Sequence, residues 1–246
     1  MPAGGTGLVL RGLRKEPATI GKWHLGWDLT YKEGKAKTVD NIDFTKRVAN
    51  GPTDRGFDYF YGLTSPSGPP HLYMVNDMAE KQPNTRFEES GGGLYKIKGG
   101  IGHSDWSADG MQPHLADKML EYLDENKDSD KPFFLYMALT APHIPLFPSK
   151  EFKGKSKIGD YGDLVMMIDD IVGRVNRKLK EIGKYDNTIV MFAADNGCAG
   201  YINMDRINRK GHYPSYIYRG YKSHGWEGGH RIPFILSWGD RYGHVT

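Results

Sequence analysis

The residues of this chain that could do chemistry lie at the ends of apolar runs, and they are Lys22, His24, His143, Asp195, Asn196 and Lys222. Each of the runs 18–20, 133–139 and 188–194 is followed by members of this set, while Lys222 precedes the run 232–238. In open α/β sheets the ligand crevice lies at the carboxyl ends of the strands. Polar groups placed there by several strands therefore predict a binding site.

The residue types indicate an oxyanion site beside a metal. Asp195 and Asn196 offer a carboxylate and an amide oxygen, which are ligands that Ca²⁺ or Mg²⁺ prefers. No cysteine or histidine pair accompanies them, so zinc is not expected. Lys22 and Lys222 can neutralise a sulfate or phosphate ester, and His143 can protonate a leaving oxygen.

Each of these signals also has a plainer interpretation. An Asp-Asn-Gly sequence after a strand is often only a turn, and His143 between two prolines can be a loop residue. Lys22 and Lys222 taken alone are typical solvated charges. A short basic stretch, 153–157, is interpreted as a solvated loop.

Helices and strands alternate along the second half of the chain. The spacing of apolar residues predicts a helix over 112–126 and a longer one that ends near Gly183. Continuous apolar runs predict buried strands at 133–139 and 188–194, with a last strand at 232–238. This alternation indicates an α/β fold with a mainly parallel central sheet covered by helices on both faces. Residues 64–104 hold many Gly and Pro residues, so they are predicted to be an irregular surface insertion.

Composition excludes several classes of protein. Lys and Arg number 33 against 30 Asp and Glu, so the net charge of +3 does not indicate a nucleic-acid partner. No stretch of about 18 apolar residues is present, so no transmembrane segment is predicted. A single cysteine, Cys198, excludes an internal disulfide. We expect one partial catalytic domain over 1–246, and the oligomeric state is left open.

Six segments in order resemble the sulfatase family from about residue 18 onward. They are GKWHLG (21–26), NGPTDRGFDYFYG (50–62), KPFFLYMALTAPHIPL (131–146), DYGDLVMMIDDIVGRVNRKL (160–179), NTIVMFAADNG (187–197) and RGYKSHGWEGGHRIPFI (219–235). A further stretch, PPHLYMVND (69–77), is similar to arylsulfatases and N-acetylgalactosamine-6-sulfatases. The resemblance implies the alkaline-phosphatase-like α/β sandwich. Residues 1–17 match poorly.

The resemblance also implies roles for particular residues. Lys22 and His24 look like the pair that supports the nucleophile and contacts the sulfate, and Lys222 looks like the second sulfate-binding lysine. His143 looks like the histidine that assists the leaving group. Two calcium ligands of the family are similar to Asp195 and Asn196. No catalytic role is carried onto His224 or His230.

Two features of the family have no counterpart in these 246 residues. The family nucleophile is a formylglycine made within a Cys/Ser-x-Pro-x-Arg motif, and no such motif is present. Cys198 is followed by Gly200 and Ile202 where that motif needs proline and arginine. The first family strand, with paired aspartates for the calcium, is also missing. We therefore expect weakened Ca²⁺ binding and no turnover by this chain, which resembles the middle of a sulfatase without the smaller C-terminal domain.

Alternative functions remain open at this point. One is a non-catalytic remnant that binds sulfate esters or sulfated glycans, and another is a phosphoester or phosphonate hydrolase of the same superfamily. The resemblance implies a sulfated small molecule or glycan as the ligand. Family members are usually exported, periplasmic, extracellular or lysosomal, although this sequence shows no signal peptide, so its own compartment stays unknown.

Overall fold

A computed structural model describes residues 16–239. The chain divides into two compact units, one ending at Ser149 (unit 1) and one beginning at Lys150 (unit 2), and each is described by itself. Of the poorly matching segment 1–17, residues 1–15 lie outside the described residues.

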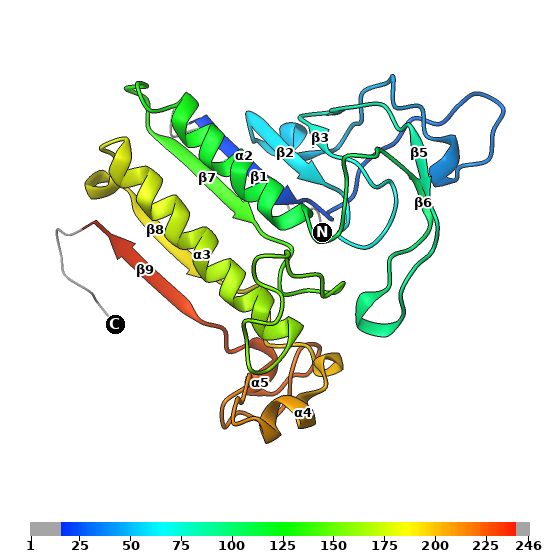
Figure 1. Cartoon of the computed structure of the whole chain (residues 1–246). Coiled ribbons are helices and arrows are strands. Elements are labelled where there is room, and N and C mark those ends of the chain that lie inside the picture. Colours follow the sequence, from blue (N-terminus) through cyan, green and yellow to red (C-terminus); the bar gives the residue numbers. More distant parts are fainter. Residues whose placement is uncertain (1–15, 240–246) are drawn as a thin grey trace. The chain divides into compact units, whose positions relative to one another are not determined.

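Unit 1 is built on a five-stranded mixed sheet with the strand order β4-β3-β2-β1-β7. Its strands are β1 (Glu16–Lys22), β2 (Tyr59–Leu63), β3 (Met74–Val75), β4 (Met78–Ala79) and β7 (Phe133–Ala138). The central strand β1 is parallel to both β2 and β7, and β3 and β4 are added antiparallel (Figure 1). The carboxyl ends of β1, β2 and β7 therefore share one edge, which confirms the α/β class with parallel central strands.

Helix α2 (Met111–Glu125) forms where the sequence predicts a helix, and it packs against β1 and β2. Its apolar face is buried because Leu115, Met119 and Leu123 recur every four residues. Tyr122 stacks on Tyr59 of β2 with a centroid distance of 5.8 Å. This helix covers one face of the sheet and is the element nearest in sequence to β7.

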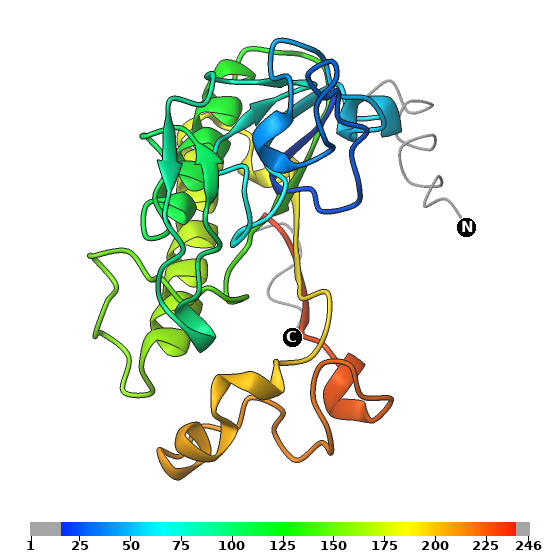
Figure 2. The same cartoon turned by 90° about the vertical axis from the view of Figure 1, so that its right-hand side faces the viewer.

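Residues 64–104 are more ordered than the predicted surface insertion. They contain β3 and β4, a 3-10 turn at Gly93–Tyr95, and a second antiparallel pair, β5 (Thr85–Phe87) with β6 (Gly100–Gly102), seen in Figure 2. His71 is buried between the rings of Phe87 and Trp106 and hydrogen-bonds the carbonyl of Lys98. The Gly and Pro residues thus shape turns around a packed centre.

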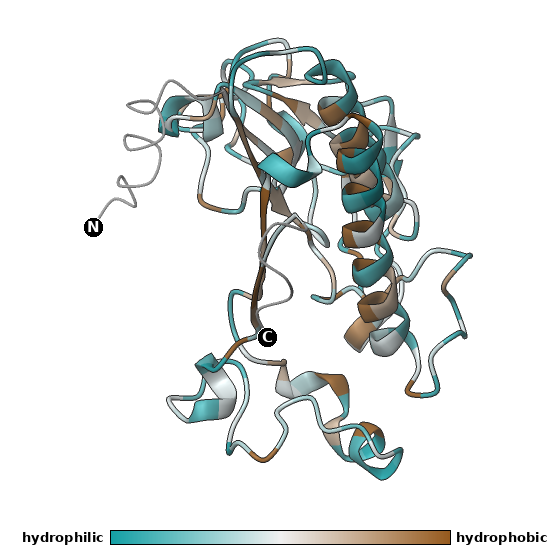
Figure 3. Ribbon diagram, turned by 90° about the vertical axis from the view of Figure 1, so that its left-hand side faces the viewer, coloured by the Kyte–Doolittle hydropathy of each residue, from teal (hydrophilic) through white to brown (hydrophobic). Residues whose placement is uncertain are grey.

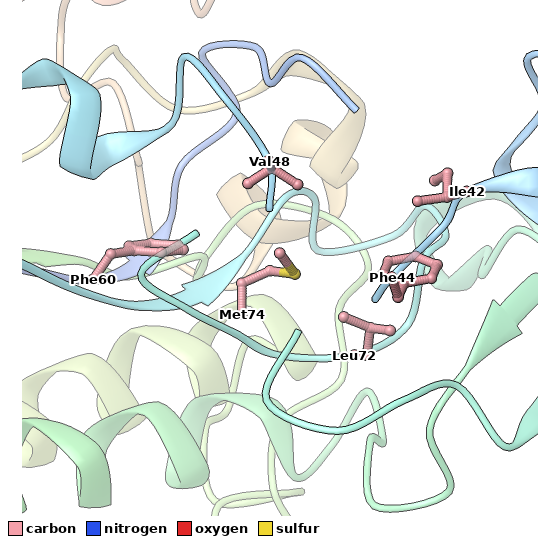
Figure 4. Packing of buried hydrophobic residues seen from close by; sticks show 6 residues of the cluster. All are labelled: Ile42, Phe44, Val48, Phe60, Leu72 and Met74. Carbon is pink, nitrogen blue, oxygen red and sulfur yellow. The ribbon is translucent and has the colours of Figure 1, made fainter. Parts of the chain in front are cut away.

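A hydrophobic cluster joins this segment to β2 and to residues 42–48. Figure 4 shows its six buried members, which are Ile42, Phe44, Val48, Phe60, Leu72 and Met74. The mostly polar stretch 27–58 contains no α-helix and no named strand. It forms 3-10 turns at Val39–Asn41 and Pro52–Arg55 and supplies half of this cluster, because a few apolar residues in an irregular segment suffice to anchor it.

Unit 2 contains helix α3 and a two-stranded sheet. Its elements are α3 (Asp160–Glu181), β8 (Ile189–Ala193), α4 (Met204–Arg209), α5 (Glu227–His230) and β9 (Phe234–Trp238), with 3-10 turns at Tyr185–Asn187 and Gly200–Ile202. Helix α3 has one buried stripe, and the long helical ribbon in Figure 3 carries both hydrophobic and hydrophilic residues along its length. Strands β8 and β9 pair antiparallel in register from Ile189–Trp238 to Ala193–Phe234. Over residues 16–239, no helix has the length and hydropathy needed to cross a membrane.

The predicted burial of the strands at 133–139 and 188–194 is wrong. No residue of β7 is fully buried, and Tyr136 is 52% exposed. Strand β8 forms as expected, but Ile189 and Met191 are exposed, as are Phe234, Ile235 and Leu236 of β9. Within the described residues, β8 and β9 pair only with each other, so no neighbouring strand flanks the pair. Apolar composition predicted the strands but not their surroundings.

Candidate functional site

Lys22 is the last residue of β1, and its position depends on the glycine before it. Gly21 has a φ of +131°, which L side chains rarely adopt, and a Cβ there would lie 2.0 Å from the carbonyl oxygen of Ala138 in β7. Gly21 also pairs with Gly62 of β2, where a Cβ would lie 1.7 Å from the Gly21 oxygen. Only glycine permits these strands to approach so closely. The approach brings the carboxyl ends of β1 and β7 together.

His143 lies in the loop that follows β7. Its backbone N–H donates to Thr140 O at 3.0 Å, and its Nδ1 lies 2.6 Å from Ile144 O. A carbonyl only accepts, so the proton of this hydrogen bond is on Nδ1. Proton exchange with a ligand is therefore left to Nε2, which is the arrangement that a general acid needs.

Gln112 of α2 holds the loop that bears His143 through side-chain hydrogen bonds. The side chain of Gln112 is 2% exposed and hydrogen-bonds the Thr140 hydroxyl. With its amide oxygen toward the loop, it accepts from the backbone N–H of Thr140 at 3.0 Å and from that of Ala141 at 2.6 Å. Three hydrogen bonds from one buried side chain give the loop a defined path.

The charges of Lys22 and His143 both act on the ring of His24. Partial burial lowers the pKa of His24 below its ordinary value of 6.5, and the charge of Lys22 and then that of His143 lower it further. These neighbouring positive charges disfavour protonation of His24 unless an anion binds beside it. His24 itself has a φ of +51°, an uncommon conformation for a non-glycine residue. This end of unit 1 can therefore bind an anion.

Unit 2 holds the other predicted residues. Asp195 and Asn196 follow β8 in a bend that is tied to α5 by Gly197 N donating to Gly229 O at 2.9 Å. Lys222 N donates to Cys198 O at 2.8 Å, so the loop carrying Lys222 lies on the same bend. The structure brings these three residues into one part of unit 2.

The donor set does not make a complete calcium site. Asp195 and Asn196 are adjacent and supply two oxygen-bearing side chains, whereas Ca²⁺ takes about 6–8 oxygen ligands. Among residues 16–239, no group of three or more His, Cys, Asp or Glu side chains could hold a metal ion. These residues can contribute two ligands, and further ligands would have to come from elsewhere.

Cys198 and the two spare histidines take no part in the predicted chemistry. The Cys198 thiol lies 3.2 Å from Ser215 Oγ and 3.6 Å from Met204 Sδ, and burial raises its pKa. A raised pKa keeps the thiol protonated and a poor nucleophile. The ring of His224 is tilted by 35° against that of Tyr221, with the ring centroids 4.1 Å apart, and His230 ends α5.

The structure therefore groups the predicted residues into two sets. Lys22, His24 and His143 meet at one end of unit 1, and Asp195, Asn196 and Lys222 occur together in unit 2. Sequence reasoning missed Gln112. The sequence does show that Gln112 is a polar residue on the apolar side of the helix predicted at 112–126. A buried amide there needs hydrogen-bond partners, which is the feature that could have identified it.

Comparison with known proteins points to one family. A sequence model described as Sulfatase matches residues 9–245. The N-acetylgalactosamine-6-O-sulfatase of Bacteroides thetaiotaomicron is 30% identical over an alignment of 254 residues that covers 89% of this chain and 48% of that protein. An arylsulfatase of Hemicentrotus pulcherrimus is 30% identical over 219 residues, which are 89% of this chain and 35% of that protein.

A solved structure supports the same relationship. It comes from work on the metabolism of multiple glycosaminoglycans by Bacteroides thetaiotaomicron, and it matches with a TM-score of 0.74 and 27% identity. The match covers 93% of this chain and 53% of the other. The chain thus spans about half the length, or less, of the relatives it matches.

Proposed function

Because this chain belongs to the sulfatase family, we propose that its site residues bind a sulfate ester and serve its hydrolysis. In that reaction R–O–SO₃⁻ and water give R–OH and hydrogen sulfate. The observation that carries the proposal is the grouping of Lys22, His24 and His143 where parallel strands end.

Lys22, His24 and His143 of unit 1 have different proposed roles, which follow from the chemistry of their side chains. Lys22 and His24 hold the sulfate oxygens, since a fixed positive charge stabilises the charge that develops as the S–O bond breaks. His143, protonated on Nε2, gives that proton to the departing alcohol oxygen. The hydrogen bond from Nδ1 to Ile144 O keeps the ring in the orientation for this transfer.

The roles proposed for unit 2 come from the family motif alone. Lys222 is the second sulfate-binding lysine, and Asp195 and Asn196 are two ligands of a Ca²⁺ ion. When bound, that ion would supply a Lewis acid beside the sulfate. Two side chains are too few to bind that ion tightly.

The nucleophile is not among these residues. No Cys/Ser-x-Pro-x-Arg sequence occurs between residues 1 and 246, so a formylglycine cannot form within them. We therefore propose that the 246-residue chain binds sulfate esters without turning them over. This absence also favours the second candidate function, a non-catalytic sulfate-binding role, for the chain by itself.

Binding can be tested on the chain as it stands. Inorganic sulfate should raise the pKa of His24, measured by NMR titration of its ring, because a bound dianion offsets Lys22 and His143. Lys22→Ala should abolish this response, and Lys37→Ala, which removes an exposed lysine elsewhere in unit 1, should leave it intact. A His24 titration curve that is unchanged by sulfate would refute the proposed site.

Turnover gives the second test. We expect no hydrolysis of 4-nitrocatechol sulfate by this chain. Measurable turnover that disappears in Lys222→Ala would show that a nucleophile other than formylglycine operates, and it would overturn the proposed non-catalytic state.

The substrate class is proposed from the relatives. One is named for N-acetylgalactosamine-6-sulfate and another for aryl sulfates, so the ligand is a sulfated sugar or a small sulfate ester. An extracytoplasmic location belongs to the same proposal and is supported by the family resemblance.

A further inference from the structure

Two short segments of unit 2 carry an unusual concentration of positive charge. They are KGKSK at 153–157 and RINRK at 206–210, and together they contain six cations and no carboxylate. The whole chain has a net charge of only +3. All six side chains are exposed, and we call them the basic surface: Lys153, Lys155, Lys157, Arg206, Arg209 and Lys210.

The fold makes one surface from these two segments, although they lie about fifty residues apart. The ammonium group of Lys210 donates a hydrogen bond to the carbonyl oxygen of Lys157. A Cβ placed on Gly159 would lie 3.9 Å from Arg206 Nη2. The loop 150–159 and helix α4 are therefore in direct contact within unit 2.

The loop that carries the three lysines is fixed by a buried carboxylate. Asp163 of α3 is 0% exposed and accepts from Gly154 N at 2.7 Å and from Ser156 N at 2.5 Å. The ammonium of Lys155 lies 5.0 Å from the ring centre of Phe152, which is itself buried. A preformed loop loses less conformational entropy on binding than a mobile one.

The charges of the basic surface are not neutralised by the protein. Among residues 16–239, none of the six cations forms an ion pair, whereas Lys178 of the neighbouring helix α3 pairs with Glu181 at 2.9 Å. The nearest acidic residues in sequence are Glu151 and Asp205, outside the two segments. Because the two segments are in contact and their six exposed cations form no ion pair among residues 16–239, they produce a local positive field that attracts a polyanion.

We propose that the basic surface binds a polysaccharide that carries several sulfate groups, as a contact separate from the sulfate being hydrolysed. This inference rests on the proposed function, because the sulfated polymer is the polyanion that such a site would process. Nucleic acid is the weaker alternative, since neither segment contains an aromatic side chain on which a base could stack. The protein would then prefer sulfated polymers to small sulfate esters.

The test measures binding of fluorescently labelled chondroitin 6-sulfate chains to the 246-residue protein. The triple variant Lys153→Ala, Lys155→Ala, Lys157→Ala should weaken binding about tenfold, and the difference should shrink as NaCl is raised. Arg206→Ala with Arg209→Ala should weaken it similarly. The matched control is Lys32→Ala, Lys35→Ala, Lys37→Ala, which removes three exposed lysines of unit 1 and should change affinity less than about twofold.

Each possible result of this experiment either supports or overturns the inference. Equal losses in the triple variant and its control, or no binding of the sulfated chains, would overturn the inference. Duplex DNA that binds more tightly than chondroitin 6-sulfate would replace it with a nucleic-acid surface. The sulfate response of His24 is read in the same samples. A lost response with intact chain binding would reject the proposed function alone, and the reverse result would reject the basic surface alone.

Discussion

Strand β1 of unit 1 and strand β9 of unit 2 lie in opposite surroundings, although β9 (FILSW) is the more apolar of the two and β1 has the sequence EPATIGK. Ile20 of β1 is 0% exposed, whereas Ile235 of β9 is 59% exposed. Strand β1 is flanked on both edges by β2 and β7, and α2 packs on it. Strand β9 pairs only with β8 among the described residues.

The difference teaches that burial is a property of neighbours and not of composition. An apolar run guarantees that a strand gains from being covered, because hydrophobic stabilisation is proportional to the area removed from water. It does not supply the covering element. Unit 1 has the covering elements within the described residues, and the β8–β9 pair lacks them. The same contrast predicts that substitutions in unit 1 cost much more than similar ones in β8 and β9.

The largest effect is expected at the glycine contact of unit 1. Gly21→Ala would place a Cβ 2.0 Å from a backbone oxygen of β7, and it also imposes an unfavourable φ. We expect a loss of about 4–5 kcal/mol in the free energy of unfolding, measured by urea titration with circular dichroism. The control is Gly92→Ala, where no atom lies within 4 Å, and it should be nearly neutral. A stable Gly21→Ala protein would contradict the close approach of β1 and β7.

A matched pair of isoleucines tests the comparison directly. Ile20→Ala should cost about 3–4 kcal/mol, because it opens a cavity in a closed core. Ile235→Ala should change the free energy of unfolding by less than about 0.5 kcal/mol, because its side chain is already in water. Both are read from thermal and urea unfolding. Equal costs at the two positions would mean that β9 is covered in solution.

A smaller effect is expected where unit 1 supports its binding loop. Gln112→Ala leaves the buried N–H groups of Thr140 and Ala141 without an acceptor, which should cost about 1–3 kcal/mol. It should also weaken the sulfate response of His24, because His143 loses its fixed path. Gln82→Ala, which removes a different side-chain hydrogen bond to backbone in unit 1, serves as the control and should leave that response unchanged. An unaltered response in Gln112→Ala would assign this residue a purely structural role.

The smallest effect is a pH dependence confined to unit 1. Burial lowers the pKa of His71 and His114 below 6.5, and His24 shifts the same way. The unfolded chain then binds more protons than the folded one just below pH 6.5, so stability falls as the pH drops through this range. Urea midpoints at pH 7.5 and pH 5.5 should show the decrease, and a higher midpoint at pH 5.5 would reverse the assigned direction. The pKa values of Asp43 and Asp105 are also lowered, but they affect stability only at pH values near or below 3.8, the ordinary pKa of an aspartate.

Several features of this protein could be predicted from the sequence because they depend on local patterns. The two long helices and the strands at 133–138 and 189–193 follow from the spacing and length of apolar runs. Lys22 and His143 could be placed near each other, because the carboxyl ends of parallel strands meet. Membership of the sulfatase family follows from motifs in order along the chain, and the comparisons confirm it.

Other features were decided only by tertiary structure. Gln112 reaches the His143 loop because helix and loop pack together, and no spacing in the sequence records that contact. Lysines interpreted as a solvated loop join the arginines of α4 because Asp163 folds the loop back.

The physical reason is the range of the forces involved. Backbone hydrogen bonding and side-chain periodicity act over a few neighbouring residues, so the sequence by itself determined the elements, the family and the residues at the strand ends. Burial, charge clustering and the path of a loop depend on groups far apart in the chain. Only the packed structure therefore decided that Ile20 is enclosed, that Ile235 is exposed, and that six cations share one surface.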